Sequence, residues 1–261
     1  MSDADQLLKA GDLDGARAAL VETVRSKPSD QGARMYLFQL LAIAGEWDKA
    51  RKQLATLAQL SPEAQMLSIA YGQAIEAEAA RARVFAGEEL APLLVDAEWA
   101  RPIPLAIQAF AIGRDAEGEA ARDAAFDAAP EMAGEIDGVA FDWIADADSR
   151  FGPTFEAIIG GRYGLVPFDA VESMKSEGPR DLRDIIWYPV EISFKSGQSI
   201  AAMLPARYPG SEASDDTAER LTRTTGWRDT SWGQAGSGQH IWALSNGEDR
   251  DLLSVRLLTL A

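Results

Sequence analysis

The segment GEWDKARKQLATLAQLSP, residues 45–62, decides the fold of the N-terminal half. It places a proline 17 positions after a glycine, with alanines and leucines at helical spacing between them. The same spacing separates Gly11 from Pro28 and Gly113 from Pro130, so the three starts are offset by 34 and then by 68 positions. A period of 34 residues is typical of stacked helical hairpins. The sequence therefore predicts an array of paired helices, an architecture that usually binds other proteins.

Helices are predicted where apolar side chains recur at three- or four-residue intervals. Four such segments are residues 3–10, 13–26, 31–44 and 47–60. With each proline at position 32 of a tetratricopeptide-type unit, the second unit starts at Gln31, and Ala50 is the small residue at the helix crossing. The third unit matches the repeat pattern at its start and no longer matches it after Gly87. We expect a short superhelix of about three hairpins with an irregular end near residues 85–105.

The first helix of each pair in such an array lines the concave face. The register places both apolar and uncharged polar residues there, a mixture that suits an amphipathic helix bound in a groove. The predicted partner-binding residues are Met35, Gln39, Ile43, Met66, Ile69 and Gln73, with Leu8 and Glu76 on the same face. The alternative is that these side chains are buried against a capping helix or against the rest of the chain.

The composition changes between about residues 140 and 165, where alanine-rich helix gives way to glycine turns and short β-type runs. We therefore predict two domains, residues 1–145 and 146–261. Strands are predicted at 165–168, 185–188, 191–194, 199–204, 240–244 and 252–258. Residues 155–159 fit a strand or a helix end, and 215–225 have helical composition. The predicted fold class is α+β, with a small, mainly β, partly open barrel or bent sheet and one helix after the helical repeats.

The overall composition excludes several classes of function. The 261 residues include no cysteine, which rules out disulfides, thiolate zinc sites and cysteine nucleophiles. A net charge of −16 repels nucleic acid and anionic membrane surfaces, so neither is expected as a partner. The acidic N-terminus lacks the pattern of a secretory signal, and no apolar run is long enough to span a bilayer. We expect a cytoplasmic protein, and the sequence does not define its oligomeric state.

Candidate catalytic features are weak. The glycine-rich stretch 233–238 lacks the Lys-Ser/Thr of a phosphate-binding loop, and His240 is the single histidine. Acidic pairs that could hold a cation are Asp215 with Asp216, Asp181 with Asp184, and Asp142 with Asp146 and Asp148. We predict no catalytic residues, no metal site and no cofactor. The alternative is an enzyme of unknown reaction in the C-terminal domain, with the helical repeats as a partner platform. It requires a ligand-sized pocket where His240 meets at least two of these acidic side chains.

The loop before the second predicted strand alternates in charge. Arg180, Asp181, Arg183 and Asp184 could form an ion-pair network that fixes this loop to the barrel, or a recognition loop directed at a partner. We favour the structural role, because arginine bridges carboxylates and can hold an irregular segment in place.

Several motifs of the C-terminal half are distinctive, namely residues 178–187, 151–153, 204–211, 225–227 and 236–239. Together they resemble the ImpE family, also called TagJ, whose members are accessory proteins of bacterial type VI secretion. The resemblance implies a cytoplasmic, non-enzymatic adaptor that binds the N-terminal helix of the small contractile-sheath subunit. It further implies an indirect influence on the Clp-type ATPase that disassembles the sheath. It assigns no individual functional residues.

Overall fold

The computed structural model describes residues 3–261, and the first two residues of the predicted helical domain, Met1 and Ser2, lie outside the described residues. The four predicted helices are confirmed to within one residue: α1 (Asp3–Lys9), α2 (Leu13–Ser26), α3 (Gln31–Ile43) and α4 (Trp47–Leu60). Asp30 caps α3 by accepting a hydrogen bond from the Ala33 amide at 2.9 Å. Gly45 ends α3 with a φ of +69°, a conformation that favours glycine.

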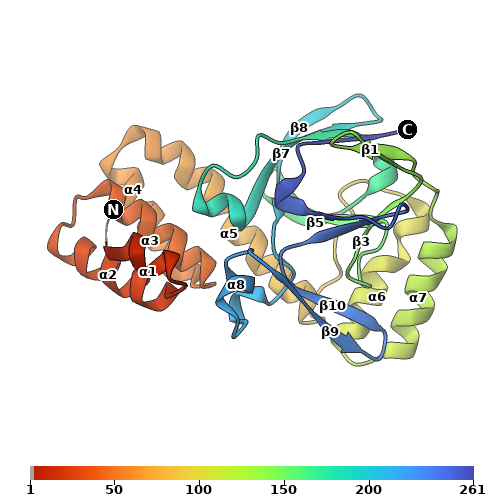
Figure 1. Cartoon of the computed structure of the whole chain (residues 1–261), viewed down its shortest axis with the longest axis horizontal. Coiled ribbons are helices and arrows are strands. Elements are labelled where there is room, and N and C mark those ends of the chain that lie inside the picture. The colour runs from red at the N-terminus through yellow and green to blue at the C-terminus, as the bar shows by residue number, and fades with distance from the viewer. Residues whose placement is uncertain (1–2) are drawn as a thin grey trace.

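Helix α5 (Pro62–Phe85) is long and has no antiparallel partner helix immediately after it. It leads from the four-helix block to the β-rich part (Figure 1) and packs on strand β5. The expected irregular end follows, with the short 3-10 helix η1 (Glu98–Ala100) in it. The chain then forms a third hairpin from α6 (Pro102–Ala111) and α7 (Asp115–Ala128), which lies beside the β-rich part (Figure 1). None of the helices within residues 3–261 has both the length and the apolar character that crossing a bilayer requires.

The C-terminal part is built on one bent, open sheet of eight antiparallel strands, in the order β2-β1-β13-β6-β7-β8-β4-β5. A three-stranded sheet, β12-β11-β3, and the β9-β10 hairpin complete it. The strands are β1 (Gly134–Ile136), β2 (Val139–Phe141), β3 (Ile144–Asp146), β4 (Thr154–Ile159), β5 (Arg162–Pro167), β6 (Val171–Lys175), β7 (Trp187–Phe194), β8 (Ser199–Pro205), β9 (Thr225–Thr230), β10 (Gly233–Gly238), β11 (Ile241–Leu244), β12 (Asp249–Asp251) and β13 (Leu257–Leu260).

Several strand predictions need correction. The two strands predicted at 185–188 and 191–194 are one strand, β7, because Pro189 lies within it without breaking the pairing with β8. The segment 252–258 starts as the 3-10 helix η5 (Leu252–Ser254) before β13. Residues 215–225 contain only the one-turn helix α8 (Thr217–Arg220). The glycine-rich stretch 233–238 is not a loop but strand β10, paired along its length with β9.

The hydrophobic core has two parts. One lies within the β-rich part and includes Phe155, Phe168 and Trp242. The other is shared between the helices and the sheet, because Trp187 of β7 packs on Trp47 and Tyr71 with ring centroids 5.9 and 5.6 Å apart. The division of the chain at residue 145 stays a prediction, although β1 and β2 before that point already belong to the eight-stranded sheet.

Candidate functional site

An exposed apolar face runs along helix α5. Met66 and Ile69 expose 73% and 59% of their surface, and the side chain of Gln73 follows one turn later on the same face. Ser61 caps the helix and Pro62 occupies its first turn, so this face begins at a rigid helix start. Exposed apolar side chains that lie together on one helix face can contribute to a docking surface.

The exposed face of α5 borders a groove against the sheet. Gln73 and Ala70 line one side of a pocket of about 310 Å³, and strands β7 and β8 line the other with Pro189 and Met203. The turn between β4 and β5 closes one end, where Gly161 approaches Gln73 so closely that a Cβ would lie 3.0 Å from the Gln73 Cβ. The groove thus joins an apolar helix face to an apolar strand surface, an arrangement that can hold an amphipathic helix.

The corresponding face of helix α3 is covered by the chain itself. The 3-10 helix η3 (Leu182–Ile185) lies on α3, and Gln39 donates a hydrogen bond from Nε2 to Asp181 Oδ1 at 2.5 Å. Ile43 is fully buried, and its carbonyl accepts a hydrogen bond from Arg207 Nη1 at 2.8 Å. Met35 is half-buried against Arg183. The three predicted binding residues on α3, Met35, Gln39 and Ile43, therefore contact the C-terminal part. The three on α5, Met66, Ile69 and Gln73, are exposed.

The charged loop 180–184 joins the two parts of the chain. Asp184 Oδ2 accepts the backbone amides of Arg180 and Asp181 at 2.8 and 3.0 Å, which closes a capping box around η3. Arg183 pairs with Asp181 at 3.3 Å and lies over the ring of Tyr71 at 5.0 Å. Arg180 instead pairs with the exposed Glu177. The contacts of this loop are therefore with helices α3 and α5 and with its own backbone.

A buried charge network lies between α5 and the sheet. Arg81 of α5 donates two hydrogen bonds to Glu156 of β4, at 2.7 and 2.6 Å. Glu156 also faces His240 Nε2 at 3.0 Å, and His240 Nδ1 faces Asp146 at 2.7 Å. Tyr208 donates from its hydroxyl to the second oxygen of Asp146 at 2.9 Å. All five side chains are buried, so charges and hydrogen-bonding groups satisfy one another without water.

The charges of this network follow from its geometry. Burial alone lowers the pKa of His240, but the Asp146 and Glu156 carboxylates outweigh it and raise that pKa to about 9. Burial raises the pKa of Glu156, but Arg81 and His240 reverse the effect and hold it at about 2. Burial also raises the pKa of Asp146, and the positive charge of His240 opposes that effect. At neutral pH, His240 is therefore protonated and Glu156 beside it is ionised.

The network does not meet the requirement of the enzyme alternative. His240 contacts Asp146, which is one of the acidic candidates, and Glu156, which is not. Both ring nitrogens are engaged and the side chain is buried. A nitrogen that already holds its proton in a buried ion pair is not free to act as a base. Among the other acidic candidates, Asp216 caps α8. Within residues 3–261, no group of three or more acidic or histidine side chains is arranged to hold a metal ion.

Comparisons with known proteins agree with this architecture. A family model described as "ImpE protein" matches residues 138–259, and one described as "Tetratricopeptide repeat" matches residues 7–70. A protein of Pseudomonas aeruginosa, "Type VI secretion system accessory component TagJ", is 42% identical over 250 residues, which cover 94% of this chain and 86% of that protein. The chain belongs to the ImpE family. The crystal structure of protein VPA1032 from Vibrio parahaemolyticus shares its fold, with a TM-score of 0.90 at 20% identity over 100% of this chain and 98% of that one.

The buried network connects the ImpE-matched segment to a helix outside it. Asp146, Glu156 and His240 lie within residues 138–259, whereas Arg81 lies between the two matched segments. The sequence analysis missed Arg81 and Glu156. Part of the sequence does indicate Arg81, because Glu78 and Arg81 are two charged residues one turn apart on the face of α5 that also carries Ala74 and Ala77. All four side chains are buried.

Proposed function

We propose that this protein is a cytoplasmic, non-enzymatic accessory component of a type VI secretion system. In this proposal it binds the N-terminal helix of the small sheath subunit, and it modulates indirectly how a Clp-type ATPase handles the contracted sheath. Membership of the ImpE family and the resemblance to TagJ support the accessory role. The tetratricopeptide-like helices support a protein partner.

The observation that carries the binding step is the exposed face of α5. Met66 and Ile69 lie one turn apart beside the groove, so a bound helix could cover them and place its next apolar residue between Gln73 and Met203. The face is uncharged at its centre, which suits the apolar side of an amphipathic helix. Glu76 follows one turn after Gln73 and is exposed, and it pairs with Arg51 of α4 at 3.2 Å.

The test is a calorimetric titration with a synthetic peptide of the sheath subunit's first twenty or so residues. We expect a Kd on the order of 1 μM, about −8 kcal/mol, with a negative heat-capacity change from apolar burial. Ile69→Glu places a charge in the apolar contact and is expected to weaken binding at least about tenfold. Met35 is not a clean probe, since it is half-buried beneath Arg183.

Leu105→Glu is the matched control, because Leu105 exposes 52% of its surface on α6, outside the groove. Equal binding by Ile69→Glu and by the unaltered protein would refute the groove. The effect on the ATPase is measured separately, as the rate of disassembly of purified sheaths. That rate should change when the unaltered protein is added to the sheaths and the ATPase. It should not change when the Ile69→Glu variant is added instead.

A further inference from the structure

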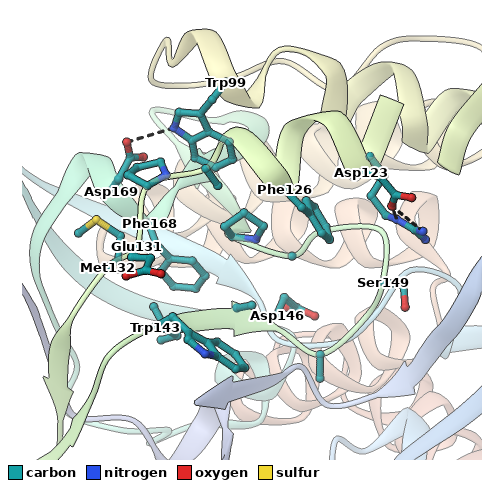
Figure 2. Close-up of a pocket in the computed structure, with 18 of the residues that line it drawn as sticks. Trp99, Asp123, Phe126, Glu131, Met132, Trp143, Asp146, Ser149, Phe168 and Asp169 are labelled. Atoms are coloured by element: carbon teal, nitrogen blue, oxygen red, sulfur yellow. Dashed lines mark hydrogen bonds and ion pairs between the residues drawn. The ribbon is translucent and has the colours of Figure 1, made fainter. Parts of the chain in front are cut away.

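A larger pocket, of about 630 Å³, lies between helix α7 and strand β3 (Figure 2). Trp99 and Phe126 lie on one wall and Trp143 on the opposite wall, with Phe168 between them (Figure 2). None of the residues that line this pocket lines the groove beside α5. The proposed helix-binding function therefore leaves this pocket unexplained.

The walls of the pocket are held in place by contacts among the lining residues and with helix α6. Trp99 donates a hydrogen bond from its indole nitrogen to Asp169 Oδ2 at 3.1 Å. Trp232 stacks on Phe110 of α6 with ring centroids 4.6 Å apart. The ring of Phe126 lies close to the backbone of Gly152, and a Cβ atom at position 152 would be 2.0 Å from that ring. A pocket with fixed walls loses little entropy when a ligand enters, which favours binding.

Among the described residues that line the pocket, Trp143 is the one large apolar side chain that is exposed, with 45% of its surface free. A tryptophan at the mouth of an apolar pocket can close over a ligand side chain and exclude water from it. Tryptophan is also the residue most enriched where binding energy concentrates in interfaces. The exposure of Trp143 thus distinguishes this pocket from a packing defect.

The charge around the pocket is negative. Its only basic lining residue, Arg122, pairs with Asp123 at 2.8 Å and donates to the backbone carbonyl of Trp232. Glu131 and Asp169 have no lysine or arginine partner within residues 3–261, and Asp169 Oδ1 has no hydrogen-bond partner there. Both carboxylates lie at the same end of the pocket, beside Met132 (Figure 2). An unpaired carboxylate next to aromatic faces attracts a cation and repels phosphates and carboxylates.

We propose that this pocket binds a lysine or arginine side chain, together with an adjacent apolar side chain, from a segment of a partner protein. The aliphatic stem of the basic residue would lie against Trp99 and Trp143, and its charged end would reach Glu131 and Asp169. The volume holds two or three side chains but not a folded helix. The net charge of −16 raises the association rate of any such basic segment.

The test uses capped five-residue peptides, Ala-Leu-X-Leu-Ala, in which X is Lys, Arg, Gln or Glu. Binding is followed by NMR through the indole N–H signals of the full-length protein, assigned with single Trp→Phe variants. We expect the Lys and Arg peptides to shift the Trp143 and Trp99 signals saturably and to bind about tenfold more tightly than the Gln and Glu peptides. Their binding should also weaken as salt is raised.

Variants separate this pocket from the groove. Trp143→Ala and Asp169→Asn should each weaken binding of the Lys peptide about fivefold or more. Trp227→Ala removes a tryptophan of similar exposure outside the pocket and should leave binding unchanged, as should Ile69→Glu on α5. No saturable shift at about 10 mM peptide, equal binding of the Glu peptide, or equal weakening by Trp227→Ala would overturn the proposal.

Discussion

At the scale of single residues, Arg81 joins the two parts of the molecule by charge. It reaches from α5 to Glu156 of β4 with two hydrogen bonds and donates a third to the Arg207 carbonyl at 2.7 Å. Burial of these charges is expensive, so the pair need not stabilise the fold more than an apolar pair of the same size would. Each partner still depends on the other, because loss of one would leave Glu156 with His240 alone at 3.0 Å, or Arg81 with Glu78 alone at 3.5 Å.

Arg81→Met is therefore expected to lower the free energy of unfolding by about 3–5 kcal/mol, because Glu156 stays buried and loses its two hydrogen bonds to the guanidinium, with His240 as its remaining cationic neighbour. Urea denaturation of the full chain measures the change. The matched control is Arg83→Met on the same helix, where the ion pair with Glu89 is exposed and screened by solvent, so the loss of stability should be much smaller. Equal losses in the two variants would contradict the role given to the buried charges.

At the scale of elements, the sequence predicts the helices, which depend on local signals. It misses short strands that depend on pairing with distant segments. The helices α1 to α4 follow from glycines, prolines and apolar spacing within each segment. Strands such as β1 and β12 have three residues each and depend on pairing with distant segments, so no local period indicates them. The cover over Gln39 and Ile43 comes from residues 142 and 164 positions away, and only the structure could show it. The repeat register places Met66, Ile69 and Gln73 on one face of α5 just as it places Met35, Gln39 and Ile43 on α3, but it does not indicate which of the two faces the rest of the chain covers.

The packing of α7 on the loop before β4 depends on Gly152. Its φ of +51° favours glycine, and a Cβ there would overlap the ring of Phe126 at 2.0 Å. Gly152→Ala should therefore lower the free energy of unfolding by backbone strain plus about 1–3 kcal/mol for the displaced ring. Gly160→Ala is the control, with a similar φ of +57° and nothing within 4 Å, so it should show strain alone, about 1–2 kcal/mol. Urea denaturation measures both, and similar losses would show that α7 does not depend on this close approach.

At the scale of the whole molecule, the repeat helices and the sheet share one of the two cores. Trp187 of β7 is fully buried between Trp47 and Tyr71, and its indole nitrogen donates to Glu78 at 3.0 Å. Each part would expose this surface if the other unfolded. The structure thus favours one cooperative unit over the two independent domains that the change in composition suggests, since separate stability requires a separate core.

The full chain is expected to unfold in a single calorimetric transition whose calorimetric and van't Hoff enthalpies agree. Trp187→Ala removes the shared ring at a cost of about 3–5 kcal/mol and should move the whole transition down by roughly 10 °C without splitting it. Trp143→Ala, at an exposed tryptophan, should move it little. Two transitions, only one of which responds to Trp187→Ala, would show instead that residues 1–145 and 146–261 fold independently, and the contacts of η3 with α3 would then be an interface between domains rather than part of a common core.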